Sequence, residues 1–279
     1  MALDQIDVDE LDEKEGSGEA EMSFFDHLDV LRWHIIRSVL VWFSLAVTCF
    51  LAKDFVFGTI INGPRNEDFL TYRILCSISE SMCIKPTAFK LRTQEMGETF
   101  FTHMSVSFWM ALIIAVPYIL WEVWRFIKPG LYIKEQNNLN LFIVICSGLF
   151  FMGVMFGYFI VAPLAVNFLA AYDLPGVENT PTLGSYIDYL IMFTLPLGLV
   201  FELPVVAYFL GKLGIVSSKM LSDYRRLAIV ILLVFAGFIT PSPDILSQML
   251  VFAPLFILYE TSIYVVKRIE KQNRALEAI

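Results

Sequence analysis

A single carboxylate in the middle of an apolar stretch is the residue of this sequence best suited to chemistry. Glu202 lies near the centre of residues 190–210, LIMFTLPLGLVFELPVVAYFL, and Pro204 follows it. An apolar run of about 20 residues is long enough to cross a bilayer as a helix. A charge at the centre of such a helix costs about 2.5–3.5 kcal/mol on insertion scales, so it usually faces a polar cavity or a partner. We expect a functional role for Glu202; a protonated glutamate bonded to a neighbouring helix is the alternative.

The other candidates for chemistry are few. His27, His34 and His103 are scattered along the sequence, and we expect them at the surface or at helix interfaces rather than as metal ligands. The sequence has no zinc-ligand spacing, no phosphate-binding glycine loop and no HExxH motif. It also has no paired membrane carboxylates or serine–histidine pair, which makes an intramembrane enzyme a poor fit. We therefore predict no cofactor, no bound metal and no nucleic-acid partner.

The composition is that of a membrane protein with several spans. Of the 279 residues, 57% are hydrophobic and 17% are charged, whereas a soluble domain carries about 25% charged residues. Residues 1–22 hold nine of the 28 acidic residues and one of the 20 basic ones. We expect this acidic tail to be disordered and solvated. It lacks the basic start and apolar run of a signal peptide.

Six apolar segments predict an all-α polytopic membrane protein with six transmembrane helices. They cover residues 33–52, 103–124, 139–161, 186–210, 227–239 and 245–266. An amphipathic helix capped by Ser23 is expected to lie at the membrane surface and run into the first span. Pro163 is expected to end the third span, in which Gly153 and Gly157 permit a close helix contact. The fifth span covers only about 20 Å of a ~30 Å hydrocarbon core, which predicts a locally thin membrane.

The short loops predict the orientation, because Lys and Arg favour the cytoplasmic side. Basic residues collect at the start of the first span and after the second, fourth and sixth spans, so both termini are expected in the cytoplasm. The predicted parts are a tail over 1–22, a membrane domain over 23–268 with an extracytoplasmic cap at 53–102, and a cytoplasmic tail over 269–279.

The four cysteines are expected to differ in role. Cys76 and Cys83 share the predicted cap, on the oxidising side of the membrane, and form either a disulfide or two free thiols. Cys49 and Cys146 fall inside apolar runs and are expected to contribute to packing.

Five stretches, taken in order, resemble one protein family. They are HLDVLR at 27–32, VPYILWEVWRFIKPGLYIKE at 116–135, FGYFIVAPLAVNFL at 156–169, FELPV at 201–205 and TPSPDILSQ at 240–248. Their order, spacing and six-span topology are similar to the TatC subunit of the twin-arginine protein translocase, over about residues 23–268.

The resemblance implies a curved, concave six-helix fold in the bacterial inner membrane. It implies a non-enzymatic receptor that binds the twin-arginine signal peptides of folded precursors at its cytoplasmic face, for export driven by the proton-motive force. The expected partners are TatA- and TatB-type single-span proteins, with homo-oligomers inside a larger complex. The alternative function is a secondary transporter or ion pathway with Glu202 at its midplane site.

The resemblance also assigns residues to two sites. The predicted signal-peptide site contains Glu135, which would engage the arginine pair, together with Asp29, Arg32, Phe126, Pro129 and Tyr132. The predicted intramembrane partner site contains Glu202, Pro204, Asp244 and Gln248.

The signal-peptide site departs from the family pattern in its first motif. Val30 stands where the family often has glutamate, and Asp29 is one position earlier. One position turns a helical side chain by about 100°. From the residues alone, Glu135 could instead pair with Lys134 or Arg125 at a water-facing rim.

Overall fold

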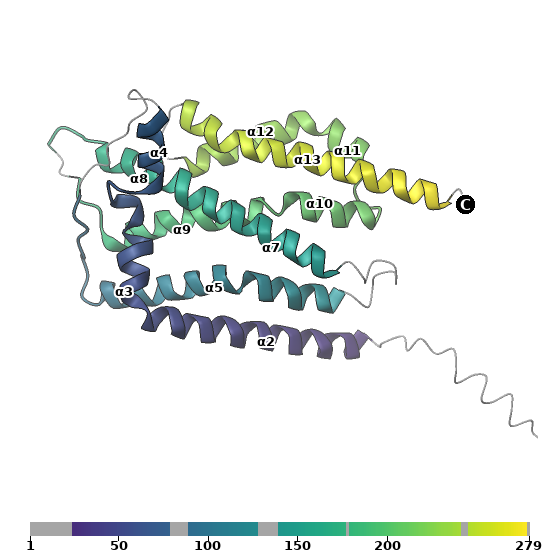
Figure 1. Cartoon of the computed structure of the whole chain (residues 1–279), viewed down its shortest axis with the longest axis horizontal. Helices are drawn as coiled ribbons and strands as arrows, with labels where there is room; N and C mark the ends of the chain where they lie inside the picture. The colour runs from purple at the N-terminus through teal and green to yellow at the C-terminus, as the bar shows by residue number, and fades with distance from the viewer. Residues whose placement is uncertain (1–23, 79–88, 128–138, 177–178, 241–244, 278–279) are drawn as a thin grey trace, which may run out of the picture.

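The computed structural model describes residues 24–78, 89–127, 139–176, 179–240 and 245–277. Long helices run side by side between two ends of the molecule (Figure 1). At one end, which we call the cap end, lie the short helices that follow the first long helix. At the other end, the terminal end, the first long helix begins and the last one finishes.

The long helices connect these ends in alternating directions (Figure 1). They are α2 (Phe24–Leu51), α5 (Glu98–Ile127), α7 (Leu139–Phe156), α9 (Leu183–Val200), α10 (Leu203–Lys212), α12 (Arg225–Ile239) and α13 (Ile245–Glu277). The shorter elements are α3 (Lys53–Phe55), η1 (Val56–Ile61), η2 (Gly63–Arg65), α4 (Leu70–Ile78), η5 (Gly157–Val161), α8 (Ala162–Ala171) and α11 (Ser218–Asp223).

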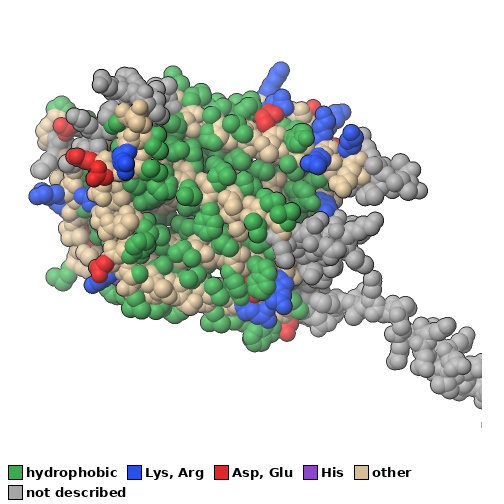
Figure 2. Space-filling view, in the orientation of Figure 1, with side chains coloured by type: hydrophobic (Ala, Val, Ile, Leu, Met, Phe, Trp, Pro, Cys, Tyr) green, Lys and Arg blue, Asp and Glu red, His purple; other side chains and the backbone are tan. Residues whose placement is uncertain are grey.

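Five helical runs of the described chain are long and apolar enough to cross a membrane. They are Leu28–Leu51, Glu98–Ile127, Leu141–Ala171, Leu183–Lys212 and Ser247–Gln272. Helix α12, with 15 residues, is shorter than these. Figure 2 shows hydrophobic side chains covering the middle of the molecule, with charged side chains gathered toward its two ends. The chain is a multi-pass membrane protein.

The third pass corrects our prediction for Pro163. Helix α7 continues through the π-helical turn η5 into α8, which ends only at Ala171. Pro163 lies in the first turn of α8, where a missing backbone N–H costs little. The prediction that Pro163 ends this span was therefore wrong. Helix α2 likewise runs unbroken from Phe24, so the expected surface helix and first span form one helix.

The fourth pass is broken at Glu202. Helix α9 ends at Val200, and α10 starts at Leu203 with Pro204 in its first turn. The intervening residues Phe201 and Glu202 form a turn whose backbone stays close to helical geometry. Pro204 has no N–H to donate, which explains why the regular helix stops before it. The break sets Glu202 at the N-terminus of α10.

Two glycines bring α7 and η5 against α9. A Cβ atom on Gly153 would lie 2.6 Å from the carbonyl oxygen of Leu197, and one on Gly157 would overlap the carbonyl of Phe193. Small residues at this spacing let helix backbones approach closely in membranes. The predicted close contact is confirmed, and it packs Phe201, next to Glu202, against the third pass.

Tyrosine hydroxyls hold the short helices of the cap end to one another and to the third pass. Tyr72 donates to the carbonyls of Pro64 and Pro163, both at 3.1 Å. Burial raises the pKa of Tyr72 to about 12, so its hydroxyl stays protonated and remains a donor. Tyr158 donates to the carbonyl of Ile60 at 2.7 Å. These bonds fix η1, η2 and α4 against η5 and α8.

Alanine at Gly153 is expected to destabilise the protein, because its Cβ would meet the backbone of α9. Overpacking of this kind costs about 1–3 kcal/mol. Gly148 on the same helix has open space around its Cβ position, so Gly148→Ala should be neutral or stabilise by up to about 1 kcal/mol. Thermal unfolding in detergent measures both variants. Equal midpoints would show that this contact does not hold α7 to α9.

Candidate functional site

The predicted signal-peptide residues that the structure describes lie at the terminal end. Asp29 and Arg32 are exposed near the start of α2, and Phe126 is half-buried near the end of α5. The Phe126 ring lies 6.0 Å from the ring of His34 on α2, edge to face. The structure thus brings these side chains to the neighbouring ends of two adjacent helices. The other predicted members, Pro129, Tyr132 and Glu135, are outside the described residues.

A buried polar cluster lies just inside these helix ends. Glu122 of α5 is 1% exposed, and its carboxylate is hydrogen-bonded to Nδ1 of His34. Tyr118 donates from its hydroxyl to Glu122 Oε1 at 2.8 Å. The Arg37 guanidinium approaches Oε2 at 3.9 Å. Both oxygens of this buried carboxylate therefore have partners.

This cluster was not predicted from the sequence. The prediction named Glu202 alone as a buried acid; the structure buries Oε1 of Glu202 and nearly all of Glu122 as well. The signal was present, because Glu122 falls in the predicted second span and a carboxylate there needs a partner. His34 does lie at a helix interface, as predicted.

Glu202 lies deeper, beside the third pass. Its carboxyl lies beside Cys146 and the backbone N–H of Phe150 on α7. The adjacent Phe201 ring lies 5.9 Å from that of Phe156. The Oε1 atom of Glu202 is buried and has no hydrogen-bond partner among the described residues. A buried polar atom without a partner is costly. This oxygen could therefore accept a hydrogen bond from a bound partner.

Gln248 makes a separate contact. Its Nε2 donates to the carbonyl of Leu233 on α12 at 3.0 Å, and the nearby Gly237 leaves space for the amide. Gln248 thus joins α13 to α12, whereas Glu202 lies against α7. Asp244, the remaining acid of the predicted intramembrane site, is outside the described residues.

Polar contacts also tie α13 to the elements before it at the terminal end. Arg225 of α12 pairs with Glu260: Nη2 donates to Oε2 at 2.9 Å, and Nε lies 2.9 Å from Oε1. Glu270 accepts from the backbone N–H of Ser218 at 2.7 Å and from its hydroxyl at 2.5 Å. These contacts fix α11 and the start of α12 against the last helix.

The structure distinguishes three of the four cysteines. Cys49 and Cys146 are buried and free, which confirms that they pack inside the protein. Cys76 is disulfide-bonded. Cys83 lies outside the described residues, so its pairing with Cys76 remains a prediction.

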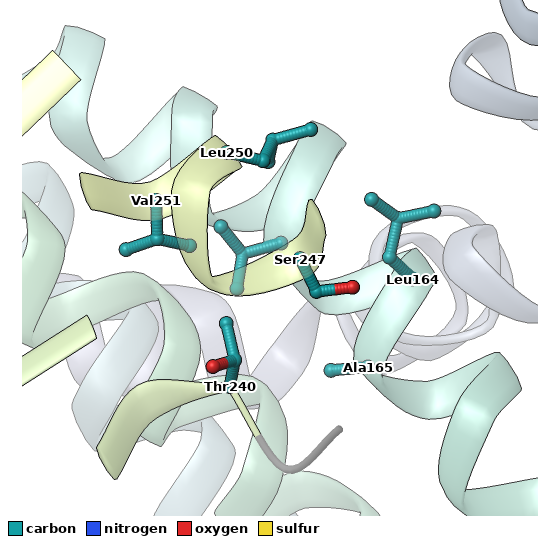
Figure 3. Close-up of a pocket in the computed structure, with 7 residues that line it drawn as sticks. Leu164, Ala165, Thr240, Ser247, Leu250 and Val251 are labelled. Carbon is teal, nitrogen blue, oxygen red and sulfur yellow. The ribbon is translucent and has the colours of Figure 1, made fainter. Parts of the chain in front are cut away.

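The lining of a small pocket includes none of the predicted site residues, although Ser247 directly precedes Gln248. Its walls are apolar side chains of η5, α8 and α13, with the hydroxyls of Thr240 and Ser247 (Figure 3). This lining offers no titratable group. Across the part of the chain that the structure describes, no group of three His, Cys, Asp or Glu side chains could hold a metal ion.

Comparison with known proteins gives a consistent result. The sequence model of the family described as Sec-independent protein translocase protein (TatC) matches residues 26–254. A TatC from Carboxydothermus hydrogenoformans is 35% identical over 255 residues, which cover 90% of this chain and 96% of that protein. A TatC from Campylobacter jejuni is 34% identical over 253 residues, with 90% and 96% covered.

Solved structures agree with the sequences. A crystal structure of the twin arginine translocase receptor TatC superposes on this structure with a TM-score of 0.65 at 31% sequence identity. The superposition covers 88% of this chain and 99% of the chain in that crystal structure. A second, of the same receptor in DDM, gives a TM-score of 0.66 at 31% identity, with 86% and 99% covered. Sequence and fold match across nearly the full length of these relatives, and the chain therefore belongs to the TatC family of Sec-independent protein translocase proteins.

Proposed function

We propose that this protein is the receptor core of the twin-arginine translocase, a transport role without enzymatic chemistry. In this proposal the terminal end binds the twin-arginine signal peptides of folded precursors. The observation that carries it is the meeting of two helix ends. Asp29 is exposed on α2, Phe126 lies on the adjacent end of α5, and the chain reaches Glu135 eight residues after α5 finishes at Ile127.

The recognition chemistry follows from the guanidinium group. Two adjacent arginines need fixed carboxylates, because guanidinium and carboxylate form paired, charge-assisted hydrogen bonds. Glu135 would supply one carboxylate and Asp29 a second. An exposed ion pair contributes only about 0–1 kcal/mol, so aromatic and apolar contacts must add to it. Phe126 and Tyr132 are the aromatic groups proposed for this role, since arginine stacks on aromatic rings.

The distribution of charge supports a cytoplasmic terminal end in the bacterial inner membrane. Exposed basic side chains gather there, as Figure 2 shows on one face. They include Lys219, Arg225, Arg226, Lys267, Arg268 and Lys271. Such an excess is typical of cytoplasmic segments. With α12 as a sixth, short crossing, both termini lie on this side.

The deeper acid suggests a second role. The buried Oε1 of Glu202 lacks a partner among the described residues, so we propose that a polar group from an inserted peptide or a TatA- or TatB-type helix binds there. The family resemblance also assigns Gln248 and Asp244 to this partner role, although the Gln248 amide bonds to α12 rather than to Glu202. Helix α12, with 15 residues, covers about 22 Å of a ~30 Å core. It would thin the surrounding membrane and draw water toward this region.

Glu135→Lys is expected to abolish binding of a twin-arginine peptide, because a cation would face the arginine pair. Glu135→Asp keeps the charge but shortens its reach, so binding should weaken. Photocrosslinking to this protein from a probe placed in the precursor next to its arginine pair measures both effects.

The matched control for charge is Asp223→Lys, which replaces an exposed acid of the terminal end with lysine. It should leave crosslinking unchanged. If Glu135→Lys still crosslinks at the level of this control, the proposed site is wrong.

Glu202→Ala is expected to separate two steps. Crosslinking at the terminal end should remain, because Glu202 lies deeper, whereas recovery of TatA-type partners with the receptor should fall several-fold. Glu202→Gln keeps a polar group and should lose less. Co-purification from crosslinked membranes measures partner recovery. Equal loss at both steps would contradict separate roles.

Thiol counting tests the proposed disulfide between Cys76 and Cys83. In the unfolded, unreduced protein, two thiols should react with iodoacetamide, those of Cys49 and Cys146, and all four should react after reduction. Mass spectrometry of the intact chain gives the count. Cys83→Ser should raise the unreduced count to three; a count that stays at two would mean that Cys76 pairs elsewhere.

A further inference from the structure

Helix α2 depends on α5 for its position. It packs along α5 over much of its length, and α5 is its principal neighbour among the described elements (Figure 1). The face of α2 that packs inward is one narrow stripe of buried and half-buried residues, which includes Leu31, His34, Trp42, Ala46 and Cys49. Many of the residues between them are exposed. The contacts with α5 therefore decide where the start of α2 lies.

The interface between α2 and α5 has two parts of different chemistry. Toward the cap end it is mainly apolar, with Ala46, Cys49 and Ala111 buried. Trp42 adds a hydrogen bond from Nε1 to the carbonyl of Phe108 at 3.0 Å. Apolar packing of this kind holds helices together but is non-directional.

Toward the terminal end the contacts are polar and directional. The buried Glu122 carboxylate binds His34 and approaches Arg37, both on α2, and it accepts a hydrogen bond from Tyr118 on its own helix. Of the hydrogen bonds described between α2 and α5, the one between His34 and Glu122 lies nearest the terminal end. A hydrogen bond fixes distance and angle, so this cluster sets the rotation and register of α2.

The cluster lies directly behind the proposed peptide site. His34 follows Asp29 by five residues, about 7.5 Å along the helix. Phe126 lies one turn beyond Glu122 on α5, on the same side, and its ring contacts that of His34. A shift of α2 against α5 would therefore move Asp29 relative to Phe126 and to the segment that carries Glu135.

We propose that Glu122 is a positioning residue for signal-peptide recognition. Through His34 and Arg37 it holds the start of α2 at a fixed distance and rotation from the end of α5, so that Asp29 keeps its place relative to Phe126 when the arginine pair binds. The inference rests on the proposed function of the terminal end. Glu122 itself is buried and does not touch the peptide.

The test measures the affinity of a twin-arginine peptide, and of its twin-lysine version, for the purified full-length receptor in nanodiscs. Glu122→Ala should weaken twin-arginine binding about tenfold, the equivalent of one charge-assisted hydrogen bond, and reduce discrimination against twin-lysine. Spin labels at positions 28 and 127 should give a broader distance distribution than in the parent protein.

Further variants separate positioning from stability. Trp42→Phe removes a hydrogen bond from the same helix pair at its apolar part, and it should leave both affinities unchanged. The exchanged pair His34→Glu with Glu122→His restores the contact in reverse, and it should recover affinity and discrimination. Glu122→Gln keeps the side-chain volume and tests the positioning role if the alanine variant does not fold. This variant should lose part of its discrimination between the twin-arginine and twin-lysine peptides.

Failure of the positioning role and failure of the proposed receptor site give different results. If Glu135→Lys abolishes binding while Glu122→Ala and Glu122→Gln keep parental affinity, discrimination and label distances, the positioning role is wrong and the receptor site stands. If Glu135→Lys leaves binding intact, the proposed receptor site is wrong, and the positioning role is overturned with it.

Discussion

The cost of burying a carboxylate among apolar helices is the constraint on which the rest of this structure depends. The chain meets it in two ways. Glu122 has partners on both oxygens, supplied by α2 and by its own helix. Glu202 has a buried oxygen without a partner among the described residues. A satisfied buried acid fixes the geometry around it, whereas an unsatisfied one favours binding of a donor.

Backbone packing determines where Glu202 lies. Gly153 and Gly157 allow the third pass to lie directly on α9, and α9 ends at Val200, just before Pro204. The carboxyl of Glu202 is thereby held at a break in a helix rather than on its surface.

Local features of the sequence predicted much of the fold. Long apolar runs gave the positions of the helices, and Gly153 and Gly157 gave a contact that the structure shows. The error at Pro163 arose because a proline in the first turn of a helix keeps its hydrogen-bonding cost low. The π-helical turn η5 leads directly into this first turn, and the third pass continues through it.

The site was predictable only in part, because its contacts are not local. The packing of α2 along α5 in the opposite direction brings Asp29 and Phe126 to the same end of this helix pair, which follows from the order of the helices. The partner of Glu122 could not be read in the same way, since His34 is 88 positions away and the pairing depends on helix rotation. We predicted Glu202 because it lies near the centre of its predicted span, where burying a charge is most costly. Glu122 lies close to the end of its helix and was not singled out.

The same separation of 88 positions has a consequence for how the protein is made. The ribosome completes α2 long before it reaches α5, so His34 and Arg37 enter the lipid environment without the carboxylate that later accepts them. Until then water or lipid head groups must solvate these two side chains, and only the arrival of α5 replaces that solvent with a carboxylate.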